Sequence, residues 1–443
     1  MKHKSFLLCA GIIAVCFLYT GSAYMSQFYR LMDFYDAQTV DVITSGLNYF
    51  LQAAGIGIIA VGIRKRPKTF ESKNLFLGLL LTGTVFMAVS QLSQNAAVIV
   101  AAGCIFNLHI GAYFAFYLAI LAKSVSPKHS GICYGTAYAV GSVGTYLFSL
   151  IGDDFLTSKG ITALYLALAI LTAVLVILPD KVNVPQQTGE KKADNSFLQY
   201  IIPMLVIMMI ISVVGSGLYY SYPQAENVNW NLIRAFYAIG LIGAGLLFDK
   251  SRFVGTICTV AGLTYPLIAV ALIGQGVSGT TSMALSYTFR GLISVYCIVT
   301  FTDLCNKGEN RFYLAAAGLL LSRLTEAVLS VLLIYIHIPD LWQLVFCAVC
   351  FVPVLLLLFI LQNKKNTIPA ADSEKRLALF SEEYGLTLRE AEILQRLSEG
   401  LTDQEIAELC FVSKSTVRFH ISNIMKKTGT STRAETIRAL KKY

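Results

Sequence analysis

The chain has 443 residues, of which 56% are hydrophobic and 14% charged, and its formal net charge is +9. Soluble globular domains carry about 25% charged residues, so this composition excludes an ordinary water-soluble protein and indicates a membrane protein. Most of the ten cysteines lie within apolar segments. Cys347 and Cys350 form a C-x-x-C pair inside such a segment, and we interpret them as packing residues rather than a metal or redox site.

The first apolar segment extends from Ser5 to Met25 and follows two lysines, as a signal peptide would. It is long, however, and Tyr24 and Met25 lead into an aromatic, polar stretch without a small-residue cleavage site. We therefore predict an uncleaved first membrane helix.

Apolar segments of about twenty residues predict twelve membrane helices. They span 5–25, 39–63, 74–92, 95–122, 131–151, 160–178, 197–221, 230–248, 253–273, 282–304, 312–336 and 341–361. With the N-terminus in the cytoplasm, the loops on the outer side hold little more than Arg30 and Lys159. The inner loops then hold Arg64, Lys65, Arg66, Lys68, Lys73, Lys123, Lys128, Lys181, Lys191, Lys192, Lys250, Arg252, Lys307 and Arg311. This bias predicts an inner-membrane protein with both termini in the cytoplasm.

The longest inner loop, 179–196, divides the helices into two sixes, 1–178 and 197–361. The segment Gly245–Arg252, with Asp249 and Lys250, is similar to the cytoplasmic G-x-x-x-D-R/K-x-G-R loop of the major facilitator superfamily. Ser251 directly precedes Arg252, so the second glycine is missing, and the equivalent loop at 62–66 lacks the aspartate. The resemblance implies a major-facilitator-like fold for residues 1–361, but fold alone does not imply transport.

The composition changes after Leu361. Residues 362–372 predict a polar linker, and residues 373–443 a small domain of four short helices. The first begins with a capping box of Thr387 and Glu390 and ends at Gly400. Its predicted core residues are Ile393, Leu394 and Leu397.

A second capping box, Thr402 with Glu405, begins the next helix, for which we expect Ile406, Ala407 and Leu409 to be buried. Ser413 caps the third helix, whose apolar face is Val417, Ile421, Ile424 and Thr428, and Gly429 ends it. Thr432 begins a fourth helix with Ala434, Ile437 and Leu440 directed to the core.

Two helices joined by a tight turn, the second with a free outer face, are typical of a helix-turn-helix. The outer face of the third helix carries Lys414, Ser415, Arg418, Phe419, Ser422, Lys426 and Lys427, and no acidic residue occurs between Ser413 and Thr430. Such a face suits phosphate and base-edge contact with double-stranded DNA. A merely solvated basic face is the alternative that charge alone leaves open.

Three segments, 386–394, 399–408 and 411–424, resemble the LuxR/GerE-type helix-turn-helix of bacterial transcriptional regulators, and the match spans about 386–440 without gaps. The resemblance implies base contacts by Arg418, Phe419 and Ser422. It implies phosphate contacts by Lys414, Thr416, His420, Lys426 and Lys427, and homodimerisation through the fourth helix. His420 as a partly buried interface residue remains an alternative. The departures are Thr428 and Thr430 in place of Leu and Val, and Phe419 at a base-facing position, which puts the sequence preference in doubt.

Charged residues inside a bilayer are costly and are candidates for function. Arg323 and Glu326 lie at i, i+3 near the middle of the eleventh span, where they predict either a ligand site or an internal ion pair. Arg290 and Arg234 have no acidic neighbour in the sequence and could hold a carboxylate or another anion in a central cavity. Polar residues of spans two and four, Asn48, Gln52, Asn107 and His109, are weaker candidates, since such residues more often serve helix contacts.

The sequence thus predicts an all-α protein: a twelve-helix polytopic bundle of six plus six helices and a four-helix helix-turn-helix domain. It predicts a one-component transcriptional regulator that senses a small ligand of unknown identity. The alternatives are a secondary transporter with a regulatory DNA-binding tail, and a constitutive regulator for which the bundle is only an anchor. No catalytic constellation is present and the five histidines are dispersed, so we expect no enzyme activity, cofactor or metal.

Overall fold

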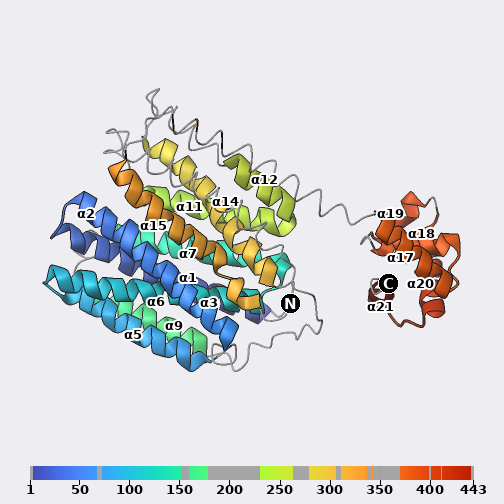
Figure 1. The fold of residues 1–443 in the computed structure, drawn as a ribbon, viewed down its shortest axis with the longest axis horizontal. Helices are drawn as coiled ribbons and strands as arrows, with labels where there is room; N and C mark the ends of the chain where they lie inside the picture. Colours follow the sequence, from blue (N-terminus) through green and yellow to red (C-terminus); the bar gives the residue numbers. More distant parts are fainter. Residues whose placement is uncertain are drawn as a thin grey trace. The chain divides into compact units, whose positions relative to one another are not determined.

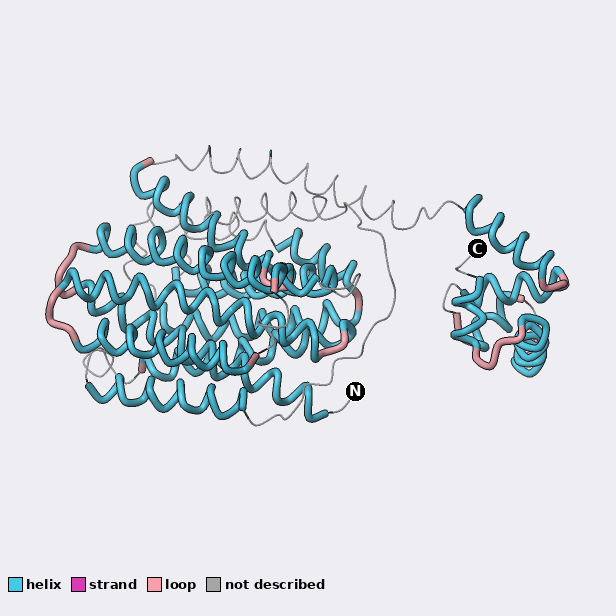
Figure 2. The backbone as a smooth tube through the Cα atoms, turned by 60° about the horizontal axis from the view of Figure 1, so that its bottom comes forward, coloured by secondary structure: helices cyan, strands magenta, loops and turns pink. Residues whose placement is uncertain are grey.

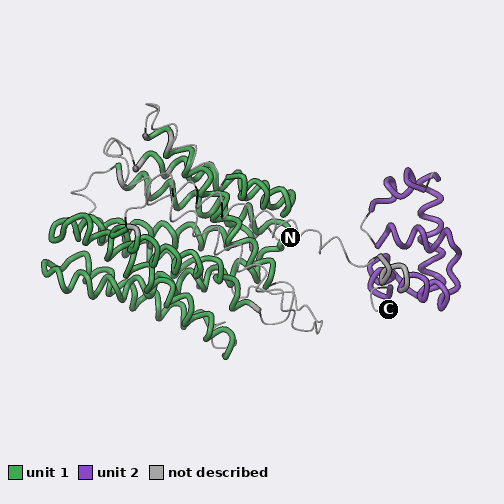
Figure 3. The backbone as a smooth tube through the Cα atoms, turned by 45° about the horizontal axis from the view of Figure 1, so that its top comes forward, with its two compact units in different colours: residues 1–357 green, residues 358–443 purple. Residues whose placement is uncertain are grey.

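The computed structural model describes residues 3–66, 72–150, 159–177, 230–262, 279–305, 311–336, 342, 345, 349, 370–398, 401–410 and 412–440. Every regular element in these ranges is a helix, which confirms the all-α class. The chain divides into two compact units, Met1–Leu357 and Leu358–Tyr443 (Figure 3). We call them the membrane unit and the DNA unit and describe each by itself.

In the membrane unit, seven helical segments are long and apolar enough to cross a bilayer: Phe6–Met32, Ala37–Lys65, Lys73–Leu92, Ala96–Ser124, Lys159–Ile177, Met283–Cys305 and Phe312–Leu332. The predicted spans 197–221 and 341–361 lie wholly or almost wholly outside the described residues. The first helix is longer than predicted and ends at Met32, because the aromatic stretch after Met25 continues the helix.

The helices of the first predicted half are α1 (His3–Met32), α2 (Ala37–Asp41), the π-helix η1 (Val42–Asn48), α3 (Tyr49–Lys65), α5 (Lys73–Leu92), α6 (Ala96–Ser124), η2 (Pro127–His129), α7 (Ser130–Ser149) and α9 (Lys159–Ile177). Those of the second are α11 (Trp230–Lys250), α12 (Arg252–Gly262), α14 (Gly279–Cys305), η4 (Arg311–Leu314) and α15 (Ala317–Tyr335). The described long helices run side by side (Figure 2).

The two halves meet where α7 packs against α11 and where α3 packs against α15 (Figure 1). Glycines allow the first contact: a Cβ on Gly135 would meet the carbonyl oxygen of Leu241, and one on Gly245 would meet Gly131 and Ile132. Small residues let membrane helices approach closely. The glycines in the sequences of α7 and α11 therefore determine where these two helices pack together.

Large apolar side chains cover the outside of the membrane unit. Leu81, Ile170 and Ile58 are 68%, 65% and 60% exposed, respectively. A soluble monomer rarely exposes an extended apolar surface, whereas contact with lipid chains requires one. These helices therefore belong in a bilayer.

The DNA unit consists of α17 (Ala370–Glu383), α18 (Leu388–Ser398), α19 (Asp403–Leu409), α20 (Lys414–Thr428) and α21 (Arg433–Leu440). The last four were predicted. The additional helix, α17, begins inside the predicted linker 362–372 and contributes Phe380, which is fully buried. The core also contains Ile393, Leu394, Val417, Ile421 and Ile424, as predicted.

Local sequence signals determine where these helices begin and end. Both predicted capping boxes form, since the backbone N–H groups of Thr387 and Thr402 donate to Glu390 and Glu405, each at 2.8 Å. Ser413 caps α20, and Gly429 ends it in the left-handed conformation with φ of 67°. Only a residue without a Cβ adopts that conformation at little cost.

Two predicted core residues were wrong. Leu409 is 47% exposed, and Cys410 is buried in its place, because α19 ends at Leu409 and the chain turns inward after it. Ala434 is exposed, whereas Thr436 is buried and its hydroxyl lies 2.6 Å from that of Thr430. The inner face of α21 is therefore set by the i, i+4 pair Thr436 and Leu440.

Candidate DNA-binding surface and central cavity

The outer face of α20 is open to solvent. Lys414, Ser415, Phe419, Ser422 and Lys426 are exposed, and the exposed fraction of Phe419 is 63%. The opposite face, with Val417, Ile421 and Ile424, is buried in the core. This division presents basic and apolar side chains together on the surface of one rigid helix.

Arg418 is held by an acidic residue of the preceding helix. Its Nε donates to Oδ2 of Asp403 at 3.0 Å, and Arg433 binds the same carboxylate through two contacts of 2.6 and 3.1 Å. The hydrogen bond from Arg433 is the largest influence that lowers the pKa of Asp403, and Arg418 adds to it. Asp403 therefore fixes the direction of Arg418, whose side chain remains 63% exposed.

Lys427 lies in an internal ion pair. Its Nζ is 2.7 Å from Glu390, and it also donates to the carbonyl of Gly385 at 2.9 Å. Burial acts to raise the pKa of Glu390, but the hydrogen bonds from Lys427 and from the backbone of Thr387 outweigh it and lower that pKa. Of the predicted phosphate contacts, Lys427 is thus the one that the structure pairs with an acidic residue, although its side chain is still 36% exposed.

His420 and Thr416 are half-buried at the edge of the exposed face. Nδ1 of His420 is buried and has no hydrogen-bond partner among the described residues. The rings of His420 and Phe419 meet edge-on, with their centres 5.8 Å apart. The half-buried position agrees with the interface alternative and still leaves the ring edge next to the exposed residues.

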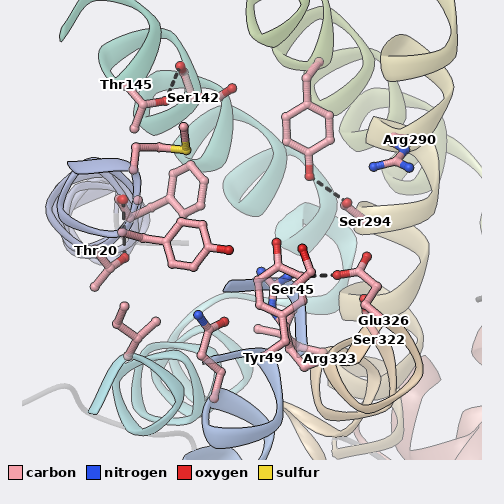
Figure 4. A pocket seen from close by; sticks show the side chains of 18 of the residues that line it. Thr20, Ser45, Tyr49, Ser142, Thr145, Arg290, Ser294, Ser322, Arg323 and Glu326 are labelled. Atoms are coloured by element: carbon pink, nitrogen blue, oxygen red, sulfur yellow. Dashed lines mark hydrogen bonds and ion pairs between the residues drawn. The ribbon is translucent and has the colours of Figure 1, made fainter. Parts of the chain in front are cut away.

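The membrane unit contains a cavity of about 850 Å³ between its two halves. It is lined from one side by α1, α2, η1, α3, α6 and α7, and from the other by α11, α14 and α15. In Figure 4, Arg290 and the pair Arg323 and Glu326 lie across the opening from Thr20 and Ser142. Binding sites for small molecules have volumes of about 300–1,000 Å³, so the space suits a small ligand.

Arg323 and Glu326, from α15, form the ion pair that was one of the two sequence interpretations, with Nη1 3.1 Å from Oε2 (Figure 4). The guanidinium of Arg323 also lies 4.3 Å from the ring centre of Tyr49 on α3. Its Nε is buried and has no hydrogen-bond partner in the described part of the chain. The pair lines the cavity, so it is both an internal ion pair and part of the cavity wall.

Arg290, from α14, also lines the cavity. Its guanidinium lies 5.0 Å from the ring centre of Tyr287, and it forms no ion pair with any described residue. Arg234 lies on α11, but its side chain is outside the described residues. The structure thus brings three of the four predicted ligand residues to one cavity.

A polar network joins the two halves at one end of the cavity. The carboxylate of Asp249 accepts hydrogen bonds from the backbone N–H groups of Gly131 and Ile132 at 2.9 and 2.8 Å. Arg252 is 3.1 Å from Asp249 and 2.8 Å from Asp303, and it donates to Ser130 at 3.0 Å. The loop that resembles the major-facilitator motif therefore connects α11 to the N-terminus of α7.

The weaker polar candidates are mainly helix contacts. The side chains of Asn48 and Asn107 donate to Gln27, and Gln52 donates to Asn107 at 2.7 Å. All four amides are buried, and of these only Gln52 lines the cavity. His109 lies 3.0 Å from the hydroxyl of Thr82, away from the cavity.

Comparison with known proteins identifies the DNA unit. Residues 385–440 match the family described as "Bacterial regulatory proteins, luxR family". The spore germination protein GerE of Bacillus subtilis is 44% identical over 52 residues, which are 70% of that protein and 12% of this chain.

The chain belongs to the luxR family of bacterial regulatory proteins. The response regulatory protein YgeK of Escherichia coli is 42% identical over 67 residues, and the transcriptional regulatory protein ComA of Bacillus subtilis is 34% identical over 77. The chain spans 46% and 33% of the lengths of these two relatives, so the likeness covers less than half of either protein.

Two solved transporter structures resemble most of the chain. The human organic anion transporter MFSD10 superposes with a TM-score of 0.56, and the fucose:proton symporter FucP of E. coli with one of 0.57. Each is 13% identical and covers 81% of this chain and 98% of the transporter chain. Identity this low shows the fold alone, and it confirms the major-facilitator-like architecture. The protein is therefore a luxR-family regulator with a membrane domain.

Sequence reasoning missed two groups of residues in this luxR-family protein. Asp403 was identified only as part of a capped helix, because its partners are 15 and 30 positions away. The tyrosines that line the cavity come from five helices: Tyr24, Tyr29, Tyr49, Tyr134, Tyr138, Tyr237 and Tyr287. Their recurrence in otherwise aliphatic spans was the available signal, but only the fold shows that they face one space.

Proposed function

We propose that this protein is a one-component transcriptional regulator of the bacterial cytoplasmic membrane. The cavity binds a small ligand, and the DNA unit binds double-stranded DNA as a homodimer through α21. The observation that carries the proposal is the combination on one chain of a luxR-family domain, with an exposed basic α20, and a membrane unit with a cavity of about 850 Å³.

In this proposal, Arg418, Phe419 and Ser422 contact base edges, and the apolar ring of Phe419 favours a thymine methyl group. Lys414, Ser415, Thr416, His420 and Lys426 contact or face phosphates, whereas Lys427 has a structural role through Glu390. The membrane domain extends over 1–361, and the distribution of loop lysines and arginines supports cytoplasmic termini. The linker then ends where α17 begins, at Ala370.

Ligand binding would change how the two halves pack, and with it the pairing or presentation of the DNA unit. A ligand shifts such an equilibrium only through different affinities for the two arrangements, and the α7–α11 and α3–α15 contacts are the surfaces that would differ.

The test is selective binding of residues 370–443 to DNA fragments from around the gene for this protein, with Arg418→Ala as the variant. Arg396→Ala, which removes an arginine of α18, is the matched control. We expect selective binding that Arg418→Ala weakens by about tenfold or more, corresponding to about 1–3 kcal/mol for one base-reading arginine. Equal, salt-sensitive binding by all three forms to every fragment would contradict the proposal.

A second candidate function is a secondary transporter whose tail regulates its own synthesis. The cavity between the two halves and the polar network that joins these halves favour this candidate. It predicts uptake of a solute that survives deletion of residues 370–443, whereas a dedicated sensor shows no uptake in either form.

A further inference from the structure

The charges around the cavity do not all have partners of their own. Among the described residues, the charged side chains that line it are Asp41, Arg290, Arg323 and Glu326. Arg323 and Glu326 neutralise each other at 3.1 Å. Asp41 lies on α2 and makes a contact elsewhere, without an ion pair to Arg290. Arg290 is left with the face of Tyr287 as its described contact.

A guanidinium that is partly removed from water and lacks a counter-ion is costly in a bilayer protein. The electron-rich face of an aromatic ring compensates only part of this cost, about 0.5–2 kcal/mol. The guanidinium still has N–H donors in a planar fork, which matches the two oxygens of a carboxylate. Within its described lining, the cavity therefore offers one unused position for a single anionic group.

Aromatic side chains line the same cavity on both of its sides. The hydroxyl of Tyr237 lies 2.7 Å from that of Ser294, one helical turn from Arg290, and the rings of Tyr237 and Tyr287 are 6.4 Å apart. On the other side of the cavity, Phe17 stacks on Tyr138 with ring centres 4.0 Å apart. Flat rings at these positions make a wall on which another flat ring packs well.

We propose that the cavity binds a small aromatic monocarboxylate, with its carboxylate on Arg290 and its ring among Tyr237, Tyr287 and the Phe17–Tyr138 stack. This inference rests on the ligand-sensing function proposed above and names its ligand class. A cationic ligand is disfavoured, because Glu326 is already bound by Arg323. A dianion is disfavoured as well, since Arg290 is the cation in the described lining without an acidic partner.

The experiment measures binding to the purified full-length protein in lipid nanodiscs by calorimetry and by the shift of its thermal unfolding. The probes are benzoate, phenylacetate and 1-naphthoate, each compared with its neutral amide, together with cyclohexylacetate and phenethylamine. We expect at least one aromatic acid to bind, its amide and phenethylamine to bind at least about tenfold more weakly, and cyclohexylacetate to bind more weakly than phenylacetate. Equal binding of acid and amide, or no binding of any aromatic acid, overturns the proposal.

Three variants and one control localise the site. Arg290→Gln should weaken binding of the acid by about tenfold or more, and Arg290→Lys should restore part of it. Arg64→Gln is the matched control, since Arg64 also lies over a tyrosine, Tyr313, but does not line the cavity. Glu326→Gln removes the negative charge beside Arg323 and should tighten anion binding. If Glu326→Gln loses binding of the acid while Arg290→Gln keeps it, the anion binds elsewhere and the proposal is overturned.

The site and the regulatory function fail in different ways. If an aromatic acid binds through Arg290 but changes neither DNA occupancy nor reporter output, sensing is wrong and the site stands. If DNA binding responds to other compounds while the acids do not bind, the regulator stands and this ligand class is wrong.

Discussion

Arginine is held in opposite ways in the two units. In the membrane unit, the side chain of Arg323 is 18% exposed and lies between Glu326 and the ring of Tyr49. In the DNA unit, the side chain of Arg418 is 63% exposed and touches Asp403 at 3.0 Å. Electrostatic contacts are strong where water is excluded and weak where water and salt reach them. The first contact is therefore part of the architecture, whereas a DNA phosphate or base can replace the second.

The difference predicts what a substitution does in each unit. Two polar contacts in the membrane unit join helices that are far apart in the sequence: the carboxylate of Asp249 binds the N-terminus of α7, and Arg252 pairs with Asp303 of α14. Their loss should change the packing of the halves. Exposed contacts in the DNA unit direct side chains toward a partner, and their loss should change binding more than folding. The four predictions below follow this distinction.

The largest effect is expected for Asp249→Asn. The variant loses the negative charge of the carboxylate that accepts hydrogen bonds from the N–H groups of Gly131 and Ile132 and pairs with Arg252. Hydrogen bonds to charged groups contribute about 1.5–3 kcal/mol each. The contact between α11 and the N-terminus of α7 should open more often. Cys133, fully buried next to Ile132, should then react with a thiol reagent about 30-fold faster in peptide-resolved mass spectrometry, which corresponds to about 2 kcal/mol.

The control is Asp33→Asn, which removes an exposed carboxylate that pairs with Arg30. It should leave the labelling rate of Cys133 unchanged. If Asp249→Asn also leaves it unchanged, the network does not hold the two halves together.

Glu390→Ala should have the next largest effect, because the carboxylate of Glu390 is buried, unlike the exposed ionic contacts that direct side chains toward DNA. Its carboxylate completes the capping box of α18 and binds Lys427, and its side chain is 5% exposed. A lost cap costs about 1 kcal/mol and a lost charged hydrogen bond about 1.5 kcal/mol or more, so the free energy of unfolding of residues 370–443 should fall by about 2–3 kcal/mol. Urea denaturation measures it, with the exposed Glu408→Ala as control. A loss no greater than that of the control would show that Lys427 and Thr387 find other partners.

The sequence predicts a structural feature well when the residues that determine it are close together along the chain. The DNA unit follows local rules: Thr387, Thr402 and Ser413 begin helices, and Gly429 ends one. The failures, Leu409 and Ala434, lie at helix ends, where the helical period no longer decides which side chain is buried.

The cavity is harder to predict, because its residues come from many helices and their convergence is a property of the packing. The i, i+3 spacing of Arg323 and Glu326 indicated their ion pair, since both lie on one helix. Nothing in the sequence placed Tyr49 over Arg323 or Tyr287 beside Arg290. For the same reason, Asp403 could not be assigned to Arg418 before the turn between α19 and α20 was known.

Neighbouring lysines on α20 sharpen the comparison within the DNA unit. Both lysines are exposed, but only Lys427 binds Glu390 and the carbonyl of Gly385 in the described structure. Lys426→Ala should lower the slope of log affinity against log salt by about 0.9, the value for one phosphate contact, without changing stability. Lys427→Ala should do the reverse, lowering the free energy of unfolding with the slope unchanged. DNA titrations of residues 370–443 at several salt concentrations measure the slopes. An equal fall in both slopes would mean that Lys427 leaves Glu390 and joins the DNA contact.

The smallest expected effect is the contribution of Asp403 to the pH dependence of the free energy of unfolding. Arg433 and Arg418 lower the pKa of Asp403. A carboxyl group whose pKa is lowered on folding stabilises the fold above its unfolded pKa, near 3.9, and this contribution is lost as the pH falls through the folded value. The free energy of unfolding of residues 370–443 should therefore fall below about pH 4, and Asp403→Asn should remove part of that dependence. Because both arginines are exposed, the part removed should not exceed about 1 kcal/mol and should shrink with added salt. Glu390 and Glu392, whose pKa values are also lowered, remain in the variant, so the difference between the two curves isolates Asp403. Identical curves would show that Asp403 only directs Arg418, with no contribution to folding.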